Sequence, residues 1–146
     1  MDRGDDWLSA VPDPQRSVAR QARALVNAAM PAGYVETLAP GMATWSVPLT
    51  RYPDTYNRQP LAYVALAARR TGCALYLTGV YQDPAADARL RAAYLRAGKK
   101  IDLGRSCLRF RRLEDLLAEA VSREIAGLTV EAFIAAHERS RTADQD

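Results

Sequence analysis

The chain has 146 residues, which suits one domain that buries a core without disulfides or a structural metal. Its apolar content of 49% and charged content of 25% are ordinary for a globular protein, and its net charge of +3 is mildly basic. No stretch approaches the roughly 18 apolar residues that a membrane span requires. The acidic, polar start shows no secretory-signal pattern. We therefore expect a single cytoplasmic domain that spans no membrane.

The N-terminal third is predicted to be helical. A short helical turn is expected at 6–11, and Asp13 followed by Pro14 is a typical helix start. In the helix that follows, apolar residues recur at the spacings of a buried amphipathic stripe. The stripe consists of Val18, Ala22, Leu25, Val26 and Ala29.

The middle third is predicted to form a sheet. The β-prone segments 34–38 and 42–47 are followed by an irregular aromatic loop, 48–60. The alanines of 61–68 also favour a helix, but a hairpin turn at 69–72 leading into 73–77 makes a strand the better interpretation.

The last third is predicted to return to helix, with one short strand. Asp83 and Pro84 begin a helix that ends before Gly98, and 106–110 is a strand. The segment 113–126 has one amphipathic stripe and is predicted to be a single helix. A final helix begins at Thr129. These elements predict an α+β domain.

The segment 104–116, GRSCLRFRRLEDL, resembles the YdhG-like family, also labelled domain of unknown function 1801. The resemblance extends in pattern over about residues 5–127, which leaves 128–146 as a C-terminal helix and tail. It implies a two-layer α+β domain, broadly similar to frataxin, with an antiparallel sheet of about five strands. The helices are expected at both ends of the chain, packed on one face of the sheet. The family has no established catalytic residues, so none are carried over.

A basic segment near the family motif is the first candidate site. Between residues 99 and 112 there are six basic residues against one acid, Asp102. Clustered ammonium and guanidinium groups bind phosphate or carboxylate. Arg69 and Arg70 are possible additions to the patch. The alternative is a solvated edge strand protected by charge. The predicted ligand-binding residues are Lys99, Lys100, Arg105, Arg109 and Arg111.

Alternation along the strand predicts which side chains of this segment share a face. Arg105, Arg109 and Arg111 have the same parity, so they are expected on one side. Leu108 and Phe110 have the opposite parity and are expected to face the core. The loop aromatics are not interleaved with the basic residues, which argues against nucleic-acid binding.

Metal binding has weaker support. The single histidine, His137, is expected at the surface, and the chain offers no standard zinc ligand set. A carboxylate site for iron would have to use Asp2, Asp5 and Asp6. The simpler interpretation is that these acids complement a helix dipole. We therefore predict no cofactor.

Common catalytic arrangements are also poorly represented. A Cys–His or Ser–His pair would have to use His137. Both Cys73 and Cys107 are expected to be buried free thiols, although an exposed Cys107 would be activated by its cationic neighbours. Five aromatic residues are core or loop packing, or else they line an open sheet face. They are Trp45, Tyr52, Tyr56, Tyr63 and Tyr76.

The sequence therefore predicts a non-enzymatic binding module for an anionic small molecule or protein partner near the basic segment. The alternative is a frataxin-like intracellular iron chaperone, because at least one member of the YdhG-like family has been described in that way. The sequence indicates neither the identity of the ligand nor the oligomeric state.

Overall fold

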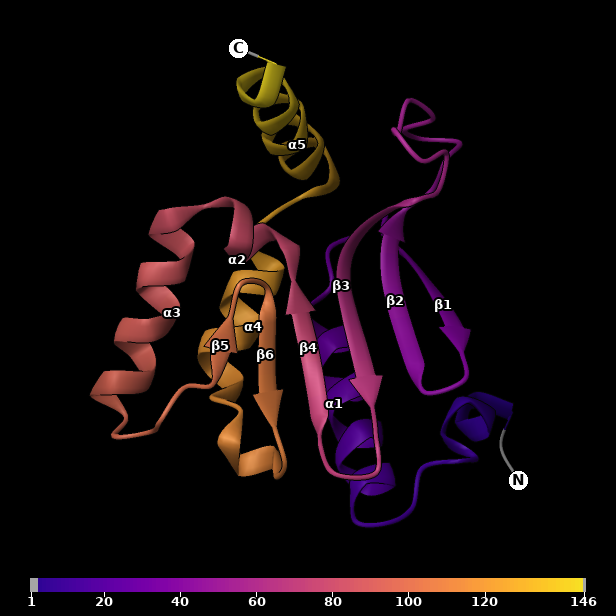
Figure 1. The fold of residues 1–146 in the computed structure, drawn as a ribbon, viewed down its shortest axis with the longest axis vertical. Helices are drawn as coiled ribbons and strands as arrows, with labels where there is room; N and C mark the ends of the chain where they lie inside the picture. Colours follow the sequence, from indigo (N-terminus) through magenta and orange to yellow (C-terminus); the bar gives the residue numbers. More distant parts are fainter. Residues whose placement is uncertain (1–2, 146) are drawn as a thin grey trace.

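An open six-stranded antiparallel sheet forms the centre of the structure, a computed structural model that describes residues 3–145 (Figure 1). Its strand order is β1-β2-β3-β4-β6-β5. The strands are β1 (Val35–Ala39), β2 (Met42–Val47), β3 (Leu61–Ala68), β4 (Cys73–Leu77), β5 (Leu103–Gly104) and β6 (Cys107–Phe110). The predicted antiparallel α+β architecture is confirmed. The sixth strand was not expected because β5, at two residues, is too short to show alternation.

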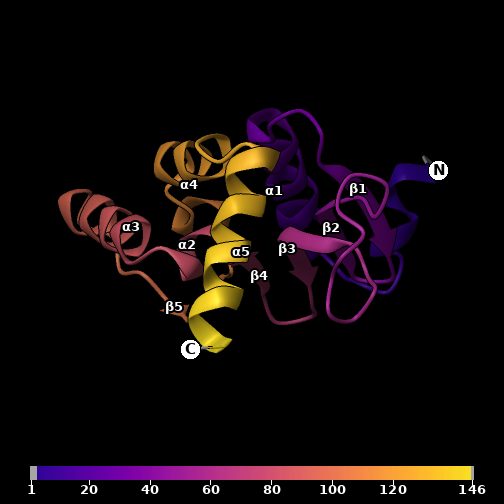
Figure 2. The same ribbon diagram turned by 90° about the horizontal axis from the view of Figure 1, so that it is seen from above.

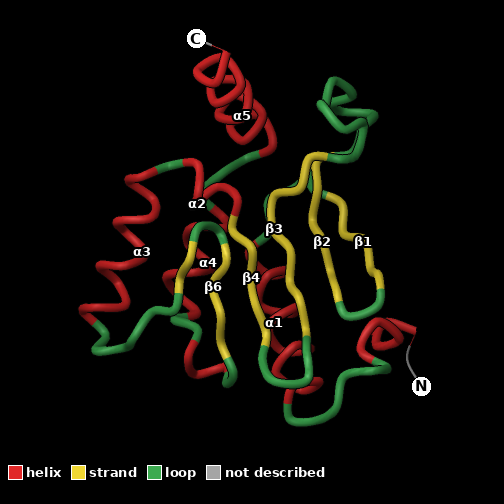
Figure 3. Tube along the Cα trace, viewed as in Figure 1, coloured by secondary structure: helices red, strands yellow, loops and turns green. Residues whose placement is uncertain are grey.

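Helices cover one face of this sheet. Figures 1 and 2 show α1 and α4 side by side behind the strands, α3 beyond the β5 edge, and α5 across one end of the sheet. Figure 3 separates the helical and extended segments by colour. The helices are η1 (Arg3–Leu8, 3₁₀), α1 (Gln15–Ala29), α2 (Thr78–Gln82), α3 (Pro84–Arg96), η2 (Leu113–Asp115, 3₁₀), α4 (Ala118–Ala126) and α5 (Val130–Gln145).

The two faces of the sheet differ sharply in burial. On the helix side, Trp45, Leu66, Leu75 and Leu108 are each at most 1% exposed. The indole Nε1 of Trp45 also donates a hydrogen bond to Asn27 Oδ1 of α1, at 2.9 Å. Because successive side chains of a strand point to opposite faces, the other face carries a different set. We call this second face the open face; Figure 1 looks onto it.

The single helix predicted over 113–126 is wrong, because the chain breaks between η2 and α4. The backbone is extended at Leu116, and the polar groups at the break are satisfied by the Tyr94 hydroxyl of α3. That hydroxyl donates to the carbonyl of Asp115 and accepts from the N–H of Leu117. A residue in another helix therefore stabilises the break, which the local apolar pattern does not reveal.

The first predicted helix is close to that observed. It begins at Gln15, and Asp13 Oδ1 accepts a hydrogen bond from the N–H of Ser17. Val18, Ala22 and Val26 are buried, as the stripe predicts. The predicted stripe therefore marks the face that packs on the sheet.

An ion pair joins this helix to the edge strand β1. The Arg23 guanidinium donates two hydrogen bonds to the Glu36 carboxylate, both at 2.7 Å. These hydrogen bonds lower the pKa of the Glu36 carboxyl below its ordinary value. Both side chains are more than two-thirds buried, so solvent screens the pair less than it would a surface pair.

Glu36→Gln is expected to lower the free energy of unfolding by about 1–2 kcal/mol at pH 7. A depressed folded-state pKa means that the stabilisation is complete above the unfolded pKa and is lost as pH falls through the folded one. The difference between wild type and variant should therefore shrink between about pH 5 and pH 2. Urea denaturation at several pH values measures it, and a difference that stays constant with pH would contradict this account.

Within residues 3–145, none of the helices has the length and apolar character needed to cross a lipid bilayer.

Candidate functional site

A hollow of about 840 Å³ lies on the open face, where β4 begins and β6 ends. It is bounded by the β3–β4 turn, the two strands and the segment before β5. We call it the open-face hollow. Its lining residues are Arg69, Thr71, Gly72, Cys73, Ala74, Tyr76, Lys100, Ile101, Asp102, Cys107, Arg109, Phe110, Arg111 and Asp115.

Strand β6 presents its polar side chains to this hollow because its apolar ones are held in the core. Leu108 is 1% and Phe110 is 4% exposed, as predicted from their parity. Cys107 and Arg109 therefore point to the open face, opposite Tyr76 and Ala74 of β4.

The segment before β5 brings one acid and one base to the hollow. Asp102 accepts twice from Arg109: its carbonyl oxygen accepts from the backbone N–H at 2.9 Å, and its Oδ1 lies 3.4 Å from Nη1. Lys100 lines the hollow next to this pair. Lys99 points elsewhere, because its ammonium donates to the carbonyl oxygen of Glu114.

Arg105 is not part of the hollow. It occupies the tight turn between β5 and β6 with a φ of +56°, so strand parity does not apply to it. This turn is at the opposite end of β6 from Arg111. The expectation that Arg105, Arg109 and Arg111 share one side is therefore wrong for Arg105, because the strand begins only at Cys107.

The structure thus places three of the five predicted ligand-binding residues, Lys100, Arg109 and Arg111, around one hollow. Arg69 joins them through the β3–β4 turn, whereas Arg70 does not line the hollow. The sequence predicted that Arg69 lies in a hairpin turn. It did not predict that this turn lies beside β6, because that depends on the order of the strands in the sheet.

The hollow carries a net positive charge. Among the side chains that the structure describes, residues 6–142, those of Arg69, Lys100 and Arg111 have neither a hydrogen-bond nor an ion-pair partner. Of the two acids, Asp102 is paired with Arg109, and Asp115 Oδ2 accepts from the N–H of Arg112. The lining therefore carries four cations against two carboxylates that are already engaged.

The two cysteines have different environments. Cys73 is buried, and burial raises the pKa of its thiol to about 11. Cys107 is half-buried and lines the open-face hollow. The expectation of two buried thiols is wrong for Cys107, because the strand places it opposite Tyr76 on the uncovered face.

His137 also departs from its prediction as a surface residue. It is half-buried in α5 with its ring edge-on to Tyr52, the centroids 5.9 Å apart. Its Nε2 atom is buried without a hydrogen-bond partner in the described part of the chain, and burial lowers the pKa of the imidazole. The Tyr52 hydroxyl donates to Glu138, so this contact fastens α5 to the loop 48–60. His137 does not line the open-face hollow.

The structure describes only one of the three predicted iron ligands in full. Asp2 and the side chain of Asp5 lie outside the described residues, and Asp6 is exposed. Among the residues that are described, no group of three or more His, Cys, Asp or Glu side chains could hold a metal ion.

The aromatic residues divide between packing and surface. Trp45, Tyr52 and Tyr63 are buried, and Tyr56 is 87% exposed in its loop. Tyr76 alone of the five aromatic candidates lines the open-face hollow.

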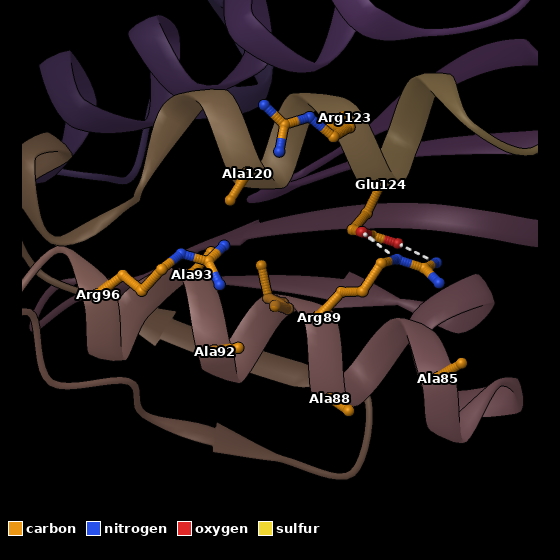
Figure 4. A pocket seen from close by; sticks show the side chains of 10 residues that line it. Ala85, Ala88, Arg89, Ala92, Ala93, Arg96, Ala120, Arg123 and Glu124 are labelled. Atoms are coloured by element: carbon orange, nitrogen blue, oxygen red, sulfur yellow. Dashed lines mark hydrogen bonds and ion pairs between the residues drawn. The ribbon is translucent and has the colours of Figure 1, made fainter.

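A second hollow, of about 430 Å³, lies between α3 and α4 (Figure 4). Alanines form half of its lining, and at one end Arg89 makes a two-pronged ion pair with Glu124. Arg96 and Arg123 lie on either side of Ala120 in Figure 4. Neither Arg96 nor Arg123 has a side-chain partner in the described part of the chain, so these two positions are matched controls for the open-face hollow.

Comparison with known proteins returned no match to any protein-family model, curated protein or solved structure. The YdhG-like resemblance therefore stays a prediction from residues 104–116.

Proposed function

We propose that this chain is a non-enzymatic binding module that holds an anionic small molecule, or an anionic group of a protein partner, in the open-face hollow. The observation that carries the proposal is the set of unpaired cations Arg69, Lys100 and Arg111 around one hollow. Guanidinium and ammonium groups without internal partners are available to carboxylate or phosphate oxygens.

The size and composition of the hollow support a small ligand. A volume of about 840 Å³ lies within the range of roughly 300–1,000 Å³ that is usual for small-molecule sites. Apolar groups such as Ile101 and Ala74 alternate in the lining with charged ones. The hollow contains no histidine, and its carboxylates are engaged, so its chemistry suits binding better than proton transfer.

The proposal is tested by titrating pyrophosphate into the protein by calorimetry. Lys100→Gln/Arg111→Gln is expected to weaken binding at least about tenfold, the equivalent of about 1.4 kcal/mol. The matched control is Arg96→Gln/Arg123→Gln, which removes the same charge from the α3–α4 groove and should change the affinity less than about twofold. Equal losses in both variants would show that only net charge matters, and the proposal would fail.

Cys107 offers an internal reporter for the same experiment. It lines the hollow, whereas Cys73 is buried and its thiol pKa is about 11. Alkylation by iodoacetamide should therefore occur at Cys107 and slow when pyrophosphate is bound. An alkylation rate that pyrophosphate leaves unchanged would count against binding in this hollow.

Membership of the YdhG-like family and a cytoplasmic location belong to the same proposal. The alternative is a frataxin-like iron chaperone. Among the side chains that the structure describes, residues 6–142, no group of ligands supports this alternative; the candidate ligands Asp2 and Asp5 lie outside them. Anion binding is preferred because it rests on side chains that the fold brings together.

A further inference from the structure

Tyr76 has an unusual position on the open face. Its neighbours across the sheet are Ala65 of β3 and Cys107 of β6, and Ala74 precedes it on the same face of β4. All three are small, so they cover only part of an aromatic ring that stands between them. Tyr76 is accordingly only half-buried, although it belongs to a central strand.

The cations of the hollow lie on the same face, farther along the strands from Tyr76. Arg109 follows Cys107 by two residues, which places it about 7 Å farther along β6. Arg111 and Lys100 line the hollow at the same end. The hollow therefore has an aromatic side with small neighbours and, separated from it along the strands, a cationic end.

We infer that the ligand of the open-face hollow is a planar aromatic ring linked to a phosphate, as in a mononucleotide. This inference rests on the proposed function and narrows it to one chemical class. The ring would stack on Tyr76 beside Ala74, and the phosphate would meet Arg109, Arg111 and Lys100. A sugar between the ring and the phosphate would span the step of about 7 Å along the strands that separates the level of Tyr76 from that of Arg109.

The physical reason for a ring is the part of Tyr76 that the sheet leaves exposed. A tyrosine ring is rigid, so it loses little conformational entropy when a ligand stacks on it. Such stacking depends little on which nucleobase is bound. A simple inorganic anion would use the cations and leave this face in water. A ligand that uses both parts should therefore bind more tightly than its phosphate part alone.

The test compares three probes by calorimetry: AMP, ribose 5-phosphate and adenosine. AMP is expected to bind wild type at least about fivefold more tightly than ribose 5-phosphate, and adenosine to bind most weakly. Tyr76→Leu should reduce AMP affinity to that of ribose 5-phosphate while leaving ribose 5-phosphate unchanged. Tyr76→Phe keeps the ring and should retain the preference for AMP over ribose 5-phosphate. If the leucine variant does not fold, a loss of this preference in Tyr76→Phe would count against stacking.

Tyr81→Leu is the matched control, because Tyr81 is 58% exposed on α2 and does not line the hollow. It should leave the affinity for all three probes unchanged. Equal affinities of wild type for AMP and ribose 5-phosphate would overturn the inference and leave the proposed function standing. If neither AMP nor ribose 5-phosphate binds, the inference is overturned, and if pyrophosphate also fails to bind, the proposed function is overturned too.

Discussion

Leu108→Ala is expected to lower the free energy of unfolding by about 2–5 kcal/mol. Leu108 is 1% exposed and pairs in the sheet with Leu75 of β4, which is also fully buried. Removing its side chain leaves a cavity between the sheet and the helices that the neighbouring residues cannot fill completely. Urea denaturation followed by circular dichroism measures the change.

The adjacent residue provides the control. Cys107→Ala, one position away on the open face, should change the free energy of unfolding by less than about 1 kcal/mol because the side chain is half-exposed. Comparable losses in the two variants would mean that the register of β6 is shifted by one residue. In that case Arg109 would not face the open-face hollow.

Gly33→Ala is the second large expected effect, with a loss of about 2–4 kcal/mol in the free energy of unfolding. Gly33 has a φ of +103°, a backbone conformation that residues with a side chain rarely adopt. An added Cβ would also lie 2.9 Å from Val130 Cγ2. Val130 is 2% exposed at the start of α5, and its branched side chain has little freedom to move away.

Gly98→Ala is the matched variant for this position. Gly98 also has a positive φ, +69°, but no atom lies within 4 Å of an added Cβ. Its loss should be about 1 kcal/mol, the cost of the backbone conformation alone. If Gly33→Ala were no more harmful than Gly98→Ala, the close contact between Gly33 and α5 would be disproved.

The strands were predictable because their signals are local. The segments 42–47, 61–68 and 73–77 coincide with β2, β3 and β4. The alternation of Leu108 and Phe110 with Cys107 and Arg109 also predicted which side of β6 is buried, once the strand was recognised. Such patterns are visible in the sequence because a covered face of a strand carries apolar residues and an open face carries polar ones.

The parts that were missed depend on residues far away in the sequence. The break before α4 is satisfied by Tyr94, and the position of Arg69 beside Arg111 follows from the order of β3, β4 and β6. Because of the turn at Arg105, β6 begins at Cys107, one residue later than predicted. His137 is shielded by Tyr52 from a loop more than eighty residues away in the chain.

The most direct test of anion binding in the open-face hollow is an NMR titration of the ¹⁵N-labelled protein with pyrophosphate. Saturable shifts are expected at the amides around the hollow, those of Gly72, Arg109 and Arg111 among them. The amides of Ala92 and Ala120, in the α3–α4 groove, should stay in place. Saturable shifts confined to that groove, or small non-saturating shifts spread over all basic segments, would contradict the account.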